Sequence, residues 1–256
     1  MKTDGRITPW LVRYKASPRA RLRLFCFPYA GGAAHVFRQW PLSLPDFIDV
    51  CVVQPPGRGG RLGERPFTRM DELVAAATPA LIPFMDMPFA FFGYSMGAMI
   101  GFELARRLRR LGAAGPKHLF VAASRAPRLA GERVTTYDLP EPQFVEDIRR
   151  LGGTPTEVLE NEELLRLMLP LLRADFAIVQ TYSYAEGPLL NCPLTAFVGS
   201  QDEDVKRENV APWGEHTTAS FSMHVLPGGH FFLHSSRCAL LEIVARELEG
   251  AAASRL

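Results

Sequence analysis

The segment Gly93-Tyr-Ser-Met-Gly97 constrains the fold of this chain more than any other. It lies between residues 89–92, an apolar run that predicts a buried strand, and residues 98–111, whose pattern predicts a helix. A strand that passes into a helix this abruptly needs a tight, strained turn. Glycines suit positions 93 and 97 because a Cβ there would crowd the neighbouring strand and helix. The motif therefore predicts that Ser95 is held above the carboxyl end of a strand.

Short apolar runs alternate with helical patterns along the rest of the chain. A last helix is expected over residues 231–248, and the runs that predict strands cover residues 22–27, 50–53, 89–92, 117–123, 194–198 and 221–226. Nearly continuous apolar strands separated by helices are typical of a mostly parallel sheet covered on both faces. A length of 256 residues suits one large domain, so we expect residues 1–256 to form a single α/β domain.

Residues 126–188 break this alternation, because no convincing strand occurs there. Helical patterns instead run over residues 140–151 and over residues 162–184, the second interrupted at Pro170. A helical insertion between two strands of an α/β sheet often serves as a lid. We expect a lid here; the alternative is a helical segment that only covers the edge of the sheet.

Ser95 in this turn is a candidate nucleophile, and a serine hydroxyl near neutral pH needs a general base. His230 follows the predicted strand 221–226 and a Pro-Gly-Gly turn, which places it at the carboxyl edge of the sheet. In proteins with this turn the histidine comes last along the chain, after the acid. His234, one helical turn further on, is the main alternative base.

The acid is expected on the loop that follows the predicted strand 194–198. Asp202 lies close enough to the end of that strand to be held rigidly, while Glu203 and Asp204 are nearby alternatives. Its role would be to accept the ring N–H of His230 and to stabilise the imidazolium.

An acyl-transfer site also needs donors for the developing oxyanion. The backbone N–H of Met96, directly after the candidate nucleophile, is one expected donor. The second should come from the loop Pro28-Tyr-Ala-Gly-Gly32, where we favour Ala30 over Tyr29. The alternative is that this loop is a simple glycine turn.

Six segments carry a resemblance to a known family. They read Leu24-Phe-Cys-Phe-Pro-Tyr-Ala-Gly-Gly32, Gln54-Pro-Pro-Gly-Arg-Gly-Gly-Arg61, Phe92-Gly-Tyr-Ser-Met-Gly97, Leu169-Pro-Leu-Leu-Arg-Ala-Asp-Phe176, Val198-Gly-Ser-Gln-Asp202 and Gly228-Gly-His-Phe-Phe-Leu233. The sequence resembles the type II thioesterases, the discrete α/β-hydrolase enzymes that accompany polyketide and nonribosomal peptide synthases. It departs from the family's pattern at Tyr94, where many relatives have His, and at Pro56, where they often have Leu.

The resemblance implies an α/β-hydrolase fold: a mostly parallel central sheet, helices on both faces and a helical lid. It also implies that the protein hydrolyses acyl groups from the phosphopantetheine thiol of acyl or peptidyl carrier proteins, which edits stalled or misprimed synthases. Ser95, Asp202 and His230 would act through an acyl-serine intermediate, with no metal or resident cofactor. The alternatives are a general carboxylesterase or acyltransferase with the same residues, and a hydrolase fold reused as a binding module.

The predicted lid would then form part of the acyl chamber. Side chains at helical spacing are expected to line it, together with Tyr29 from the glycine-containing loop, and these are Met168, Leu169, Leu172, Phe176 and Val179. The alternative for each helical residue is ordinary packing of its helix on the sheet.

Charge is distributed unevenly along the chain. The net charge is only +2, which does not suggest nucleic-acid binding, but residues 1–69 carry 12 Lys or Arg against 4 Asp or Glu. Since the carrier proteins implied by the resemblance are typically acidic, we expect Arg58, Arg61 and Arg65 to help dock the carrier or its phosphate. The alternative is solvated surface charge, with a structural ion pair at Arg58.

Other features bear on where the protein acts. No apolar run approaches 18 residues, so we expect no membrane span, and the N-terminus lacks the apolar core of a secretory signal. The four cysteines show no metal-ligand spacing. We therefore expect a cytoplasmic protein, a monomer apart from its carrier partner.

Overall fold

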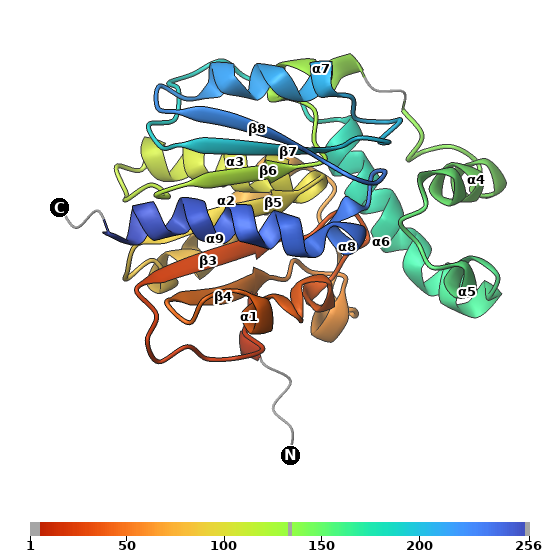
Figure 1. The fold of residues 1–256 in the computed structure, drawn as a ribbon. Helices are drawn as coiled ribbons and strands as arrows, with labels where there is room; N and C mark the ends of the chain where they lie inside the picture. Colours follow the sequence, from red (N-terminus) through yellow and green to blue (C-terminus); the bar gives the residue numbers. More distant parts are fainter. Residues whose placement is uncertain (1–5, 133–134, 254–256) are drawn as a thin grey trace.

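A mostly parallel sheet of eight strands organises the molecule (Figure 1). The computed structural model describes residues 6–132 and 135–253. Along the sheet the order is β1-β2-β4-β3-β5-β6-β7-β8, and the strands from β3 to β8 are parallel to their neighbours. The strands are β1 (Arg6–Thr8), β2 (Leu11–Val12), β3 (Leu22–Phe27), β4 (Ile48–Val53), β5 (Phe89–Tyr94), β6 (Leu119–Ala122), β7 (Leu194–Gly199) and β8 (Phe221–Leu226).

Helices cover both faces of the sheet, which explains the continuous apolar strands. Every residue of β3, β4, β5, β6 and β7 is buried. Phe25 packs into a core shared with α2 and α3, whereas its neighbour Leu24 packs into the opposite core, shared with α9. The helices are α1 (Trp40–Ser43), α2 (Met70–Leu81), α3 (Met96–Arg110), α4 (Glu141–Leu151), α5 (Thr156–Leu159), α6 (Glu162–Gln180), α7 (Arg207–Val210), α8 (Phe232–Ser235) and α9 (Arg237–Ala253).

The expected strands are all present, with ends that differ by a few residues. The sequence patterns missed the N-terminal antiparallel pair β1 and β2, because strands of three and two residues are too short to show a period. The last helix is wrong as one unit: it divides into α8 and α9 near Ser236. Helix α6 continues through Pro170, where an interruption was expected.

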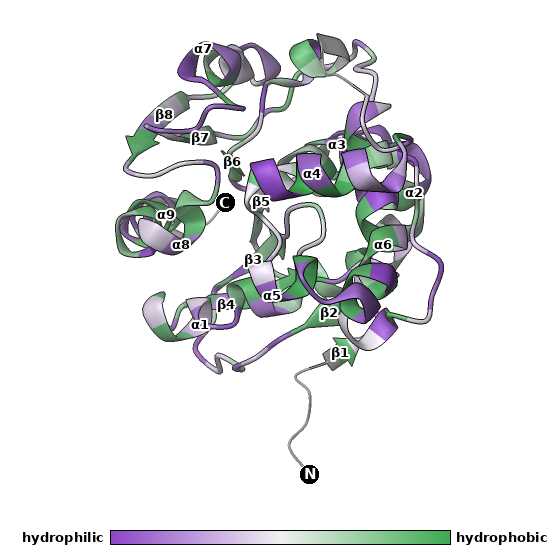
Figure 2. Ribbon diagram, turned by 90° about the vertical axis from the view of Figure 1, so that its right-hand side faces the viewer, coloured by the Kyte–Doolittle hydropathy of each residue, from purple (hydrophilic) through white to green (hydrophobic). Residues whose placement is uncertain are grey.

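The helical insertion leaves the sheet after β6 and returns at β7. Helices α4, α5 and α6 share a small apolar cluster that includes Phe144 and Ile148 of α4 and Leu169 of α6. At the start of α6 the side chain of Asn161 accepts hydrogen bonds from two backbone N–H groups of the first turn. Figure 2, which faces this side of the molecule, shows α4, α5 and α6 in front of the strands. The insertion is therefore placed to roof a site at the sheet edge.

No helix among residues 6–132 and 135–253 is both long and apolar enough to cross a membrane.

Candidate active site

Ser95 occupies the strained turn that the sequence predicted. It connects β5 to α3 with φ +52° and ψ −113°, a backbone conformation that non-glycine residues rarely adopt. A Cβ at Gly93 would lie 2.4 Å from the Cα of Ala98, and a Cβ at Gly97 would lie 2.0 Å from the carbonyl oxygen of Phe27. Only glycine fits either position, so the two glycines allow the strand, the helix and the neighbouring loop to meet around Ser95.

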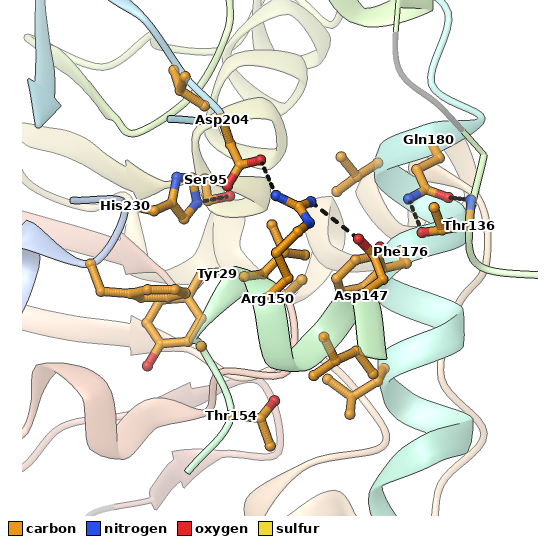
Figure 3. Close-up of a pocket in the computed structure, with 18 of the residues that line it drawn as sticks. Tyr29, Ser95, Thr136, Asp147, Arg150, Thr154, Phe176, Gln180, Asp204 and His230 are labelled. Carbon is orange, nitrogen blue, oxygen red and sulfur yellow. Dashed lines mark hydrogen bonds and ion pairs between the residues drawn. The ribbon is translucent and has the colours of Figure 1, made fainter. Parts of the chain in front are cut away.

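Three loops at the carboxyl ends of the strands bring Ser95, His230 and Asp202 together. The Nε2 atom of His230 lies 3.2 Å from the Oγ of Ser95, and its Nδ1 atom lies 2.9 Å from the Oδ2 of Asp202. Figure 3 shows the imidazole of His230 directed at Ser95. The Asp202 side chain is fully buried, and its Oδ1 accepts backbone N–H groups at 3.0 Å and 2.9 Å. This arrangement can pass a proton from the serine hydroxyl to the imidazole.

The geometry separates these residues from the alternatives. The carboxylate of Asp204 forms an ion pair with Arg150, 3.0 Å away, whereas the partner of His230 Nδ1 is Asp202. His234 instead stacks edge-on against Tyr29, and burial lowers its pKa, with Arg237 and His35 adding to the effect. The structure thus brings Asp202 and His230, not Asp204 or His234, to the serine.

The loop after β3 lies against the start of α3, where the oxyanion donors were expected. The close approach of Gly97 to the carbonyls of Phe27 and Pro28 fixes this contact. Ala30 lines the same pocket as Ser95, and Met96 is the first residue of α3. Tyr29, the alternative donor, lines the pocket too, with its ring 5.0 Å from that of Phe231.

A cavity of about 480 Å³ opens beside Ser95 and His230 (Figure 3). Its apolar wall comes from the insertion and from the loop of His230, and is formed by Ile148, Leu151, Leu172, Phe176, Val179 and Phe231. Tyr29, Leu172, Phe176 and Val179 therefore lie where the sequence placed them. Met168 and Leu169 are not among the residues that line this cavity, so the expectation for these two is wrong; both contribute to the apolar cluster of α4, α5 and α6.

Arg150 spans the cavity between the insertion and the loop of the acid. Its guanidinium lies 3.1 Å from Asp147 on the same helix and 3.0 Å from Asp204, two residues after Asp202. These two carboxylates raise the pKa of Arg150. The sequence did not predict this contact, because nothing in the pattern of residues 141–151 indicates which loop the exposed face of α4 meets.

Comparison with known proteins identifies the family. Residues 22–251 match the family model described as Thioesterase domain. The chain belongs to the thioesterase family. The curated relative named linear gramicidin dehydrogenase LgrE, from Brevibacillus parabrevis, is 43% identical over 97% of this chain and 95% of its own length. The gramicidin S biosynthesis protein GrsT, from Aneurinibacillus migulanus, is 39% identical over 95% of each chain.

The fold agrees with this membership. The solved structure of the type II thioesterase BorB from the borrelidin biosynthetic cluster has a TM-score of 0.86 and 38% identity, over 94% of this chain and 98% of that chain. The resemblance to type II thioesterases and the α/β-hydrolase fold expected from the sequence are therefore both confirmed.

The side chain of Tyr94 makes specific hydrogen bonds in this thioesterase as well as packing in the core. Its hydroxyl is buried and donates a hydrogen bond of 2.6 Å to the backbone carbonyl of His230. The same oxygen accepts the backbone N–H of Leu233 at 3.2 Å. Burial raises the pKa of Tyr94 well above its usual value, so the hydroxyl keeps the proton that it donates.

Two arginines of the thioesterase are not the free docking charges expected from the sequence. Arg58 is 3% exposed and forms an ion pair with Asp175. Arg61 is 7% exposed, pairs with Glu64 and lies 4.4 Å from the ring centre of Trp10. The docking expectation for these two residues is wrong because buried, paired guanidinium groups are not available to a partner, and the alternative at Arg58, a structural ion pair, is the one that the structure has. Arg65 is exposed, and its docking role stays a prediction.

Proposed function

We propose that the protein is a serine thioesterase that removes acyl groups from the phosphopantetheine thiol of acyl or peptidyl carrier proteins. The observation that carries this proposal is the hydrogen-bonded series Asp202–His230–Ser95 beside an apolar cavity. Membership of the thioesterase family supports the thioester as the bond that is broken. Relatives named for gramicidin S and borrelidin biosynthesis support synthase-bound chains, stalled or misprimed, as the substrates.

The reaction would take place in two acyl transfers. His230 accepts the proton of Ser95 while the Oγ attacks the thioester carbonyl, and then gives that proton to the departing thiol. Water, activated by the same imidazole, attacks the acyl-serine, releases the free acid and returns the hydroxyl to Ser95. Asp202 holds the imidazole in the orientation seen here and stabilises its charged form.

The backbone N–H groups of Ala30 and Met96 would stabilise the oxyanion in both steps. The apolar wall formed by α4 and α6 would hold the acyl chain. We propose that these groups suffice without a metal or resident cofactor, since nucleophile, base and oxyanion donors all come from the chain. The resemblance to biosynthetic thioesterases further implies a cytoplasmic monomer that meets its carrier transiently.

The test is hydrolysis of acyl groups from loaded carrier proteins by wild type, Ser95→Ala and Ser220→Ala. Ser220 is exposed and directly precedes β8, at the opposite end of that strand from the loop of His230, so it is a matched control. We expect Ser95→Ala to lose at least about 10³-fold in kcat and Ser220→Ala to remain active. Full activity of Ser95→Ala contradicts the proposal. A strong preference of wild type for a simple ester over the carrier would indicate a general carboxylesterase instead.

A further inference from the structure

A buried ion pair lies directly behind the loop that carries Ala30. Asp175 of α6 is 0% exposed, and Arg58, on the loop after β4, is 3% exposed. Two parallel hydrogen bonds join them, at 2.7 Å from Nη2 to Oδ1 and 2.9 Å from Nη1 to Oδ2. Neither residue lines the cavity or contacts Ser95, so the reaction described above does not use them directly.

Both charges also hold the backbone of the loop after β3. The backbone N–H of Gly31 donates to the Oδ2 of Asp175 at 2.7 Å, and the Nη1 of Arg58 donates to the carbonyl oxygen of Gly32 at 3.1 Å. Hydrogen bonds to charged partners are roughly twice as strong as those between neutral groups. The carboxylate and the guanidinium therefore hold two successive residues of this loop from behind.

This contact acts on the expected oxyanion donor through the planarity of the peptide bond. The N–H of Gly31 and the carbonyl of Ala30 belong to one rigid peptide unit. The hydrogen bond from Gly31 to Asp175 fixes the peptide plane that follows Ala30. This restricts the backbone of Ala30, and therefore the direction of the N–H of Ala30. Gly31 has φ +76°, and a Cβ there would lie 2.6 Å from Leu172 of α6, so the loop also rests directly on the helix.

We propose that Arg58 and Asp175 are positioning residues for the oxyanion hole. They hold the loop of Ala30 in the orientation that stabilises the tetrahedral intermediate, and this inference rests on the proposed function. Because α6 supplies Asp175 as well as Leu172 and Phe176 of the cavity wall, one helix sets both the acyl site and the oxyanion donor. A displacement of α6 by a badly fitting acyl chain would then lower kcat as well as weaken binding.

The stability of the fold does not by itself explain why the ion pair of Arg58 and Asp175 is buried here. Replacing a buried ion pair by apolar side chains of similar volume is often neutral or stabilising, whereas removing one partner is strongly destabilising. The double variant Arg58→Met/Asp175→Leu therefore removes the polar contacts to the loop and keeps the packing. A control is Arg23→Met/Asp49→Leu, which removes a second buried pair at the amino ends of β3 and β4, far along the strands from Ser95, together with its outer ion pairs to Asp86 and Arg13.

The experiment measures thermal stability, kcat, KM, the pH profile and inhibition by an alkylboronic acid, which forms a tetrahedral adduct with a reactive serine. For Arg58→Met/Asp175→Leu we expect a folded protein with kcat lowered by about 10- to 100-fold, KM within about 2-fold and an unchanged pH profile. The boronic acid should bind more weakly by a factor similar to the loss in kcat/KM. The control pair should leave all of these kinetic quantities near wild type.

Unchanged kcat and boronic-acid affinity in the double variant would overturn the inference, as would an equal loss in the control pair. If the double variant does not fold, Asp175→Asn is measured instead. It keeps the shape and an acceptor for Gly31 but loses the charge opposite Arg58, and a smaller loss in kcat with a parallel loss in boronic-acid affinity is expected. Failure of the proposed function would appear separately, as wild type without thioester hydrolysis.

Discussion

The hydroxyl of Tyr94 donates to the backbone carbonyl of His230 and accepts the N–H of Leu233. One buried side chain thus connects the strand that ends at the nucleophile with the loop that carries the base. These two hydrogen bonds therefore tie the loop of His230 to the end of β5.

Replacing Tyr94 by Phe removes only that hydroxyl. We expect a loss of about 1–2 kcal/mol in the free energy of unfolding, because the half-buried carbonyl of His230 and the buried N–H of Leu233 both lose their partner. We also expect kcat to fall by roughly 10-fold, since His230 is less firmly oriented. Denaturant unfolding and steady-state kinetics measure both, with Tyr14→Phe, a half-buried tyrosine that follows β2, as the control. Wild-type kcat in Tyr94→Phe would show that packing alone orients the loop.

The two neighbouring aspartates should respond very differently to loss of charge. Asp202→Asn cannot hold the imidazole in the same tautomer, so kcat should fall by about 10³- to 10⁴-fold. Asp204→Asn breaks only the ion pair to Arg150, so kcat should change by less than about 3-fold. Hydrolysis of an acyl-pantetheine thioester measures both. The reverse order of effects would assign the acid to Asp204.

The bridge from Arg150 to Asp204 should matter for substrate binding more than for stability. Arg150 is 58% exposed, so its ion pairs contribute less than about 1 kcal/mol to folding. We expect Arg150→Met to keep its thermal stability but to raise KM several-fold for long acyl chains, because α4 is held less firmly over the cavity. The control is Arg149→Met, whose partner Glu146 lies on the same helix. Equal KM values in the two variants would contradict a role for the bridge.

Stability should fall as the solution is acidified below pH 6.5. Burial lowers the pKa of His118 and of His216 to about 4 in the folded protein. Between pH 6.5 and 4 the unfolded chain therefore binds more protons than the native state, and the free energy of unfolding decreases as pH falls. His118→Gln should reduce this slope by about 1.4 kcal/mol per pH unit. Urea unfolding at several pH values measures it, and an unchanged slope would contradict the assignment.

Local sequence patterns predicted the parts of this protein that short-range physics determines. The turn at Ser95, the parallel strands and the loops of Asp202 and His230 follow from apolar runs and glycines. Partners distant in sequence could not be predicted in this way. The sequence offered a structural ion pair at Arg58 only as an alternative to docking, and it could not indicate the partner, because Asp175 lies 117 residues away. The contact between Arg150 and Asp204 was missed for the same reason.

The insertion joins two strands that are already neighbours, since Leu119 of β6 pairs with Leu194 of β7. The entropy cost of closing a loop grows only with the logarithm of its length, so closing an excursion of about 70 residues at this place costs little more than closing a short one. Helices α4 and α5 could therefore lengthen, shorten or be exchanged for others without disturbing the sheet, whereas α6 packs Ile178 into the core beneath the sheet. Asp175 adds a second demand on α6: any replacement must still offer a carboxylate to Arg58, or it leaves a buried guanidinium without its counter-charge.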